Sequence, residues 1–232
     1  ETSRFKDAVW YNGAQKEVII VAGCGGIGSH TVVNLARLKP LSMFIYDDDK
    51  VELANLAGQL YGLKEVNQYK VNALADKCND LANYYQIFAI TEKYTEECEA
   101  SKIMICGFDN MNARRIFFNN WLALVNNLPE EEKKDCLFID GRLSFDELQV
   151  FAITGDDTAA ITNYKDNYLF SDSEADATIC SLKQTSFMAA MIGSIITNVF
   201  VNFIANKVNA MSHPFAFLTK YNSQLMLFNT ES

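Results

Sequence analysis

The sequence predicts an α/β fold built on a doubly wound, mostly parallel sheet, with a further helix and strands toward the C-terminus. Residues 18–22 form a run rich in β-branched side chains that ends in glycines, as in a strand buried on both faces of a parallel sheet. Strand-like and helical patterns then alternate along the chain, which favours parallel strands joined by crossover helices. With 232 residues, 49% of them hydrophobic, the chain can bury the core of one such domain.

The first half of the chain supplies the beginning of this alternation. An apolar side at helical spacing follows the glycines, and the pair Lys39-Pro40 ends that helical pattern. Apolar residues next return as a short strand, before a polar loop and a second amphipathic segment. The expected elements are an N-terminal arm at residues 1–17, a helix at 29–38, a strand at 42–46, a loop at 47–65 and a helix at about 67–79.

The second half continues the pattern and then adds a long polar segment. Residues 154–178 are rich in Asp, Thr, Ser and Asn with little periodicity, so we expect a surface loop there. Arg142 follows an apolar strand, and it either contacts a ligand or orders the loop through an ion pair. The expected elements are strands at residues 89–90, 103–106, 137–139 and 147–153, a helix at 113–126, a solvated charge run at 129–135, a helix after Cys180 and an aromatic strand pair within 215–228.

Composition excludes several classes of function. The net charge of -9 and the pI near 4.8 argue against binding of nucleic acid or anionic membranes, because phosphate neutralisation needs clustered Lys and Arg. The six cysteines include no Cys-x-x-Cys pair, so no zinc is expected. Without a signal peptide pattern, a cytoplasmic location with free thiols is the expectation. Residues 187–204 are apolar but include polar side chains, so we expect a helix buried in protein.

A glycine-rich turn follows the first strand and predicts a nucleotide site. Gly23, Gly25 and Gly28 match the Gly-x-Gly-x-x-Gly pattern, with Gly26 inside it. Such glycines permit a tight turn, close approach of phosphate to the backbone, and close packing of the helix on the strand. Asp47 ends the second strand, where a carboxylate can accept hydrogen bonds from ribose hydroxyls. Alone, this motif also fits an NAD-dependent oxidoreductase.

The residues that follow the glycines favour a different nucleotide chemistry. They occur in one order along one chain: Asp47-Asp48-Asp49-Lys50-Val51, Asn55-Leu56, Gln59, Lys70, Asp109-Asn110 with Ala113-Arg114, and Cys180 before a helix rich in small residues. In this order and spacing they resemble the ThiF/MoeB/HesA family, which includes the adenylation domains of ubiquitin-activating enzymes. The resemblance covers most of the chain. It implies a single Rossmann-like adenylation domain, with a nucleotide-binding core at residues 18–153, a crossover-type loop at 154–185 and a C-terminal helix and strands at 186–232.

The resemblance implies ATP-dependent adenylation of the C-terminal carboxylate of a small ubiquitin-like or sulfur-carrier protein that ends in Gly-Gly. By motif, Asp47 would hold the ribose, Lys70 would contact phosphate oxygens and Asp109 would hold Mg²⁺. Asn55 and Gln59 would arrange the nucleotide and its phosphates. The implied nucleotide-binding set is Gly23, Gly25, Gly26, Gly28, Asp47, Asp49, Asn55, Gln59, Lys70, Asp109 and Asn110.

Two positions depart from the family pattern. Family members usually carry Arg just before the Gln that matches Gln59, and this chain has Gly58 there. A second family arginine comes from the N-terminal arm, often across a homodimer interface, and Arg4 is its best match. If neither arginine acts, the chain would bind ATP without turning it over well. A non-catalytic binding or scaffold member of the same family is therefore an alternative.

Cys180 resembles the crossover-loop cysteine of ubiquitin-type activating enzymes. In that class the thiolate attacks the acyl-adenylate and carries the activated protein as a thioester. A helix that starts near Ser181 would lower the pKa of the thiol through its N-terminal dipole. The resemblance therefore assigns catalytic roles to Cys180 and Arg4, and a plain loop cysteine is the alternative reading of Cys180.

Overall fold

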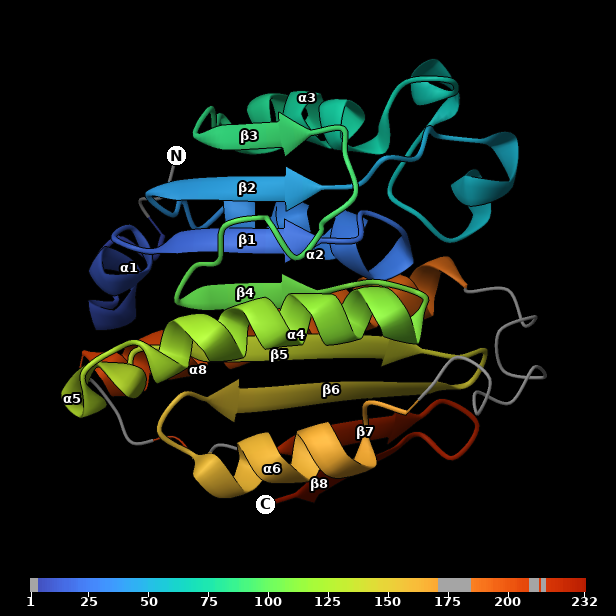
Figure 1. The fold of residues 1–232 in the computed structure, drawn as a ribbon. Helices are drawn as coiled ribbons and strands as arrows, with labels where there is room; N and C mark the ends of the chain where they lie inside the picture. Colours follow the sequence, from blue (N-terminus) through green and yellow to red (C-terminus); the bar gives the residue numbers. More distant parts are fainter. Residues whose placement is uncertain (1–3, 171–184, 209–212, 214–215) are drawn as a thin grey trace.

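The computed structural model describes residues 4–170, 185–208, 213 and 216–232. Within these residues, eight strands form one sheet in the order β3-β2-β1-β4-β5-β6-β7-β8 (Figure 1). The strands are β1 (Val18–Ala22), β2 (Ser42–Tyr46), β3 (Ile87–Ile90), β4 (Ile103–Cys106), β5 (Leu137–Leu143), β6 (Glu147–Thr154), β7 (Leu218–Asn222) and β8 (Leu227–Glu231).

The five strands from β3 to β5 in the sheet order are parallel, and β6, β7 and β8 are antiparallel. At the centre, Val21 of β1 pairs with Ile45 of β2 on one side and Ile105 of β4 on the other. This confirms the mostly parallel α/β sheet that the sequence predicts. Because parallel strands point the same way, the carboxyl ends of β1, β2 and β4 meet at one edge of the sheet.

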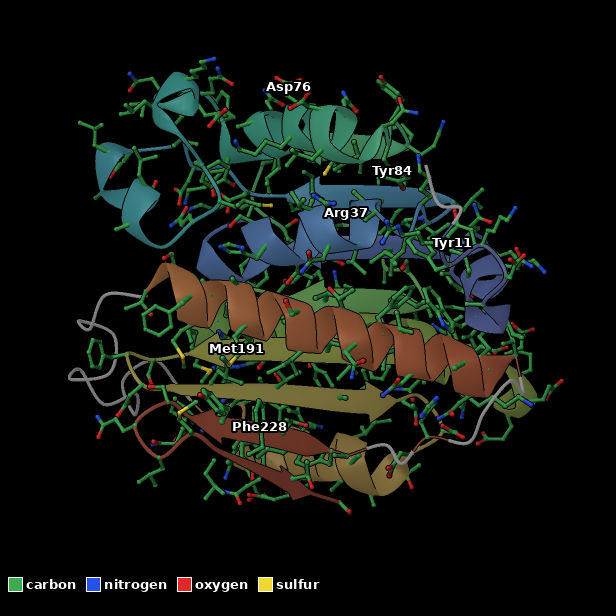
Figure 2. The ribbon with its side chains drawn as sticks, turned by 180° about the vertical axis from the view of Figure 1, so that it is seen from behind. Tyr11, Arg37, Asp76, Tyr84, Met191 and Phe228 are labelled. Atoms are coloured by element: carbon green, nitrogen blue, oxygen red, sulfur yellow. The ribbon has the colours of Figure 1, made fainter. Side chains whose placement is uncertain are left out.

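Helices cover both faces of the sheet. Helices α4 and α6 lie on the face turned to the viewer in Figure 1, and α2, α3 and α8 lie on the other face (Figure 2). The helices are α1 (Val9–Ala14), α2 (Gly26–Ala36), α3 (Lys70–Ala82), α4 (Met111–Asn126), α5 (Glu130–Lys133), α6 (Thr158–Asn167) and α8 (Ser186–Lys207), with 3-10 turns η1 (Leu53–Ala57) and η2 (Leu63–Glu65).

Side chains on the two faces of β1 pack into two separate hydrophobic cores. Ile19 and Val21 belong to the core beneath α2, α3 and α8, whereas Ile20 belongs to the core beneath α4 and α6. This alternation is the period of two that a strand imposes on its side chains. The second core is strongly aromatic and includes Trp121 and Phe138, which are both fully buried. The strand that ends in the glycine turn is therefore fixed from both sides.

Several element boundaries differ from the sequence expectation. The segment predicted as a loop at 154–185 contains α6, in which Ala160 and Tyr164 are buried and Asp157 caps the helix by accepting a hydrogen bond from Ala160 N at 2.9 Å. One apolar pair four residues apart is too weak a pattern to predict a helix. The arm at 1–17 contains α1, and the charge run at 129–135 contains the single turn α5.

The second predicted helix begins at Lys70 instead of residue 67. Asn67 has a φ of 74°, and its backbone N donates to Val51 O at 2.9 Å. An isolated bridge also pairs Lys50 with Tyr69. Residues 67–69 are thus tied to the loop after β2, and this pairing places Lys70 at the first turn of α3, beside that loop.

Among the described helices, only α8 is long and apolar enough to cross a membrane, with a mean hydropathy of 1.8. Of its most apolar 18-residue stretch, 44% is buried inside the structure. It lies beside α2 on the back of the sheet (Figure 2). The helices approach closely at Gly193, where an added Cβ would lie 2.8 Å from Cβ of His30. The glycine therefore allows the contact between α2 and α8.

Candidate functional site

A pocket of about 950 Å³ opens at the carboxyl ends of β1, β2 and β4. Ten of the eleven residues predicted to bind nucleotide line it, and Gly28 is the exception. An added Cβ at Gly28 would lie 1.9 Å from the carbonyl oxygen of Gly23, so Gly28 lets α2 pack against the turn instead of facing the pocket. The ten that line the pocket are Gly23, Gly25, Gly26, Asp47, Asp49, Asn55, Gln59, Lys70, Asp109 and Asn110.

The glycine turn has a backbone that only glycine tolerates at its first position. Gly23 has a φ of 86°, and a Cβ there would lie 2.6 Å from the carbonyl carbon of Gly107. The turn from β1 therefore passes directly against the turn that follows β4. Helix α2 begins at Gly26, so its first backbone N–H groups and its positive dipole end face the pocket. This arrangement suits a phosphate group.

Asp47 closes the other side of the glycine turn. Its carboxylate accepts hydrogen bonds from the backbone N of Cys24 at 2.7 Å and from the backbone N of Asp49 at 2.9 Å. Burial raises the pKa of Asp47, and the opposing effects of Lys70 and of these two N–H groups only partly offset that rise. Each oxygen atom keeps a second lone pair, so the carboxylate can still accept hydrogen bonds from the hydroxyls of a ribose.

Lys70 is a buried cation at the edge of the pocket, with 8% of its side chain exposed. Its Nζ donates to the carboxylate of Asp49 at 2.7 Å, and that carboxylate is largely exposed. Burial alone would lower the pKa of Lys70, but the carboxylates of Asp47 and Asp49 outweigh burial and raise it. Lys70 is therefore a charged group that can exchange Asp49 for a phosphate oxygen.

Asn55, Gly58 and Gln59 come from η1 and the residues just after it. The side-chain oxygen of Asn55 accepts a hydrogen bond from the backbone N of Glu52 at 2.8 Å, which fixes the start of η1. The side-chain oxygen of Gln59 is buried and has no hydrogen-bond partner among the described residues. Gly58 also lines the pocket, at the position where the family usually carries Arg. This wall therefore offers an unsatisfied amide oxygen but no cation.

Asp109 and Asn110 follow β4 on the opposite wall, and both are exposed. Asn110 caps α4, because its side-chain oxygen accepts a hydrogen bond from Ala113 N at 2.8 Å. An exposed carboxylate beside a pocket for phosphates fits Mg²⁺, which is usually bound by one or two carboxylates together with phosphate oxygens. The carboxylates of Asp47, Asp48 and Asp49 lie within 4.8 Å of one another and form a second possible donor set for a cation.

The lining of the pocket is acidic overall. Its carboxylates outnumber its ammonium groups by five to two, and Lys70 is already paired with Asp49. Lys93, the other cation, is largely exposed and lies 3.8 Å from Asp48. A polyphosphate bound here would therefore need positive charge from a metal ion or from outside the described lining. The five carboxylates belong to Asp47, Asp48, Asp49, Glu92 and Asp109.

The wall of the pocket formed by the segment after β3 was not predicted from the sequence. Glu92, Lys93, Tyr94 and Thr95 all line the pocket, and Tyr46 joins them from the end of β2. No motif marks these residues. The available signal was topological, because β3 is parallel to β2 and its carboxyl end must reach the same edge of the sheet.

Of the two residues with predicted catalytic roles, the structure describes only Arg4, and it does not bring Arg4 to this pocket. Arg4 is exposed and precedes α1, which lies at the amino ends of the strands, across the sheet from the pocket (Figure 1). Cys180 lies outside the described residues. Among the described cysteines, burial raises the pKa of Cys78 to about 12 and that of Cys136 to about 11, so neither thiol is activated as a nucleophile.

A comparison with known protein families matches residues 11–231 to the ThiF family. The chain belongs to the ThiF family. This confirms the resemblance that the motifs indicated, and the match extends over the pocket and both walls described above.

Solved structures with the same fold are found at low sequence identity. The crystal structure of PaaA matches with a TM-score of 0.73 at 16% identity, over 97% of this chain and 66% of that one. The structure of Escherichia coli MccB with ATP matches with a TM-score of 0.66 at 14% identity, over 96% of this chain and 65% of that one. The microcin C7 biosynthetic enzyme MccB in complex with N-formylated MccA matches with a TM-score of 0.67 at 14% identity, over 96% of this chain and 66% of that one. This ThiF-family chain therefore spans about two thirds of the length of each.

Proposed function

We propose that this ThiF-family protein uses ATP and Mg²⁺ to adenylate the C-terminal carboxylate of a small ubiquitin-like or sulfur-carrier protein. The observation that carries the proposal is the convergence of the glycine turn, Asp47 and Lys70 on one pocket. The start of α2 offers N–H groups to phosphate, Asp47 offers a carboxylate to ribose, and Lys70 offers a point charge. Solved structures of MccB with ATP and with the peptide MccA support a nucleotide and a peptide or protein as substrates.

Adenylation requires the substrate carboxylate to attack the α-phosphorus while pyrophosphate leaves. In this pocket, Lys70 would release Asp49 and bind an oxygen of the pyrophosphate as its charge develops. Asp109 would hold Mg²⁺, which would neutralise charge on the phosphates in a pocket whose own lining is acidic. Asp47 would fix the ribose and so orient the α-phosphorus toward the incoming carboxylate. Cys180 would then accept the acyl group as a thioester and AMP would leave.

In this proposal the active form is a homodimer, because α1 lies at the amino ends of the strands and the pocket at their carboxyl ends (Figure 1). Arg4 of one subunit would then reach the pocket of its partner, where the described lining lacks a free cation for the phosphates.

The ATP–pyrophosphate exchange assay tests the proposed adenylation directly, because exchange reports reversible formation of an acyl-adenylate. We expect ATP–pyrophosphate exchange that depends on the presence of a carrier protein ending in Gly-Gly.

Gly58 favours a second candidate function, a non-catalytic member that binds nucleotide and acts as a scaffold. The residue leaves the wall beside Gln59 without a cation. ATP binding without any carrier-dependent exchange would support this second candidate. Binding of a nicotinamide dinucleotide in preference to ATP would contradict both candidates.

A further inference from the structure

Next to the pocket, two arginines share one buried aspartate. Asp140 on β5 is fully buried, and its carboxylate accepts hydrogen bonds from Nη1 of Arg114 and, at 2.7 Å, from Nε of Arg142. The hydroxyl of Tyr164 donates to the same carboxylate at 2.9 Å. Burial alone would raise the pKa of Asp140, but Arg114 and Arg142 outweigh burial and lower it. These four side chains form a charged cluster, which we call the Asp140 cluster.

One end of the Asp140 cluster reaches the pocket. Nη1 of Arg114 donates to Gly141 O at 3.1 Å, and Nη2 of Arg114 donates to the carbonyl oxygen of Phe108. Phe108 lines the pocket and directly precedes Asp109. The backbone that presents Asp109 to the pocket is therefore held by a side chain of the cluster.

The other end reaches the chain that follows α6. Nη2 of Arg142 donates to the carbonyl oxygen of Tyr168 at 2.8 Å. The guanidinium carbon of Arg142 lies 4.7 Å from the ring centre of Phe151 and 6.0 Å from that of Phe170. Only 14% of the Arg142 side chain is exposed. Residues 168–170 are thus anchored to β5 through Arg142.

We propose that Asp140 and Arg142 are positioning residues that couple the pocket turn at Phe108 to the chain at residues 168–170. Charge-assisted hydrogen bonds lead from Phe108 O through Arg114, Asp140 and Arg142 to Tyr168 O, and every side chain on this route is shielded from water. The rigid fork of Arg142 holds a carboxylate and a carbonyl at once. The inference rests on the proposed nucleotide site, because nucleotide is the ligand that would act on the turn.

Hydrogen exchange of the backbone amides tests the coupling at both ends. Suitable reporters are Tyr168 N, which donates to Tyr164 O at 3.0 Å, and Gly107 N, which donates to Ala22 O at 2.8 Å. Without nucleotide, we expect Arg142→Gln to speed exchange at residues 168–170 by about 10-fold or more. Arg142→Lys should do the same while keeping the thermal midpoint near that of wild type, because an ammonium keeps the charge near Asp140 without the fork.

Lys133→Gln is the matched control, since it removes a cation from a surface ion pair with Glu130 within α5. It should leave exchange at both reporters unchanged. With Mg²⁺ and ATP, exchange should slow at residues 105–110 in wild type and in Arg142→Lys, but at 168–170 in wild type only. Unchanged exchange at 168–170 in both Arg142 variants would overturn the coupling. Protection at neither end of wild type by ATP would instead contradict the proposed nucleotide site. The coupling would then be decided without nucleotide at Gly107 N, where faster exchange in Arg142→Gln would support it and unchanged exchange would overturn it.

Discussion

At the scale of single residues, the shape of the pocket depends on positions where the presence or absence of a side chain determines the backbone conformation. Gly23 and Gly25 stand two residues apart in the same turn but differ in what they require. Gly23 has a positive φ and a backbone neighbour at 2.6 Å, whereas a Cβ at Gly25 would meet only the flexible end of Gln59 at 3.7 Å. The two glycines therefore form a matched pair for a test.

Gly23→Ala is expected to destabilise the protein by about 2 to 4 kcal/mol, because the left-handed backbone and the clash with Gly107 add together. Gly25→Ala should cost less than about 1 kcal/mol. Chemical denaturation of the two variants measures this difference. Equal stabilities would show that the turn relaxes around an alanine at position 23.

Asp140 gives the protein a defined response to acid. Its folded-state pKa is lowered, so its ionised form stabilises the fold above the ordinary aspartate pKa of about 4, and that stabilisation is lost as the pH falls through the lowered value. At pH 7, Asp140→Asn should cost about 3 kcal/mol, since it leaves two buried guanidinium groups without their carboxylate. The difference in unfolding free energy between the variant and wild type should shrink as the pH falls below about 4. A constant difference over that range would assign the loss to packing alone.

At the scale of elements, the caps decide where helices begin, and α4 shows how a cap and a candidate metal ligand can be neighbours. Asn110 caps the helix, while Asp109 stands exposed on the pocket wall one residue earlier. Their roles are therefore separable by substitution.

Asn110→Ala should lower the unfolding free energy by about 1 kcal/mol through loss of the cap. Asp109→Ala should leave stability almost unchanged and abolish Mg²⁺-dependent ATP–pyrophosphate exchange, since it removes the carboxylate proposed to hold the metal. Thermal unfolding and the exchange assay, applied to both variants, separate the two effects. If ATP–pyrophosphate exchange persists in Asp109→Ala, the carboxylates of residues 47–49 would be the metal ligands instead of Asp109.

Element by element, the sequence predicted those parts whose signal is local. Apolar runs and the glycines that end the first of them predicted the strands at 18–22 and 42–46 and the glycine turn. The boundaries of these elements agree with the structure. Helix α6 was missed because its stability comes from Tyr164, which is buried against β5 and β6 and bonded to Asp140. Such a contact joins residues 24 positions apart in the chain and leaves no periodic trace.

The candidate site shows the same division. Asp47, Lys70 and Asp109 were found because each stands in a motif at the end of a strand or the start of a helix. Glu92 and Lys93 were missed because they share only a place at the pocket edge, which depends on how β3 lies beside β2. For Arg142, the sequence left a ligand contact and an ion pair as alternatives, and the structure shows an ion pair with Asp140.

At the scale of the whole molecule, the separation of α1 from the pocket predicts complementation between subunits. Arg4→Ala and Lys70→Met should each abolish ATP–pyrophosphate exchange alone. If Arg4 acts on the partner's pocket, mixing the two variants under conditions that exchange subunits should restore activity, because each mixed dimer contains one pocket with both groups.

Random assortment gives about a quarter of the wild-type exchange rate in that mixture. A mixture of Lys70→Met with Asp47→Ala is the control, since both substitutions disable a subunit's own pocket and no mixed dimer is then complete. Activity in the control mixture, or none in the Arg4 mixture, would contradict a contribution of Arg4 across the interface.

The antiparallel extension of the sheet ends in β8, whose residues are exposed throughout. Within the described residues, β8 pairs with β7 alone, and it carries Leu227 and Phe228 at 49% and 53% exposure. Phe228, labelled in Figure 2, packs on Tyr221 on the neighbouring strand. An edge strand with unpaired amides and apolar side chains promotes edge-to-edge pairing of chains. We therefore expect β8, far along the sheet from the pocket, to contribute to association of chains in concentrated solution.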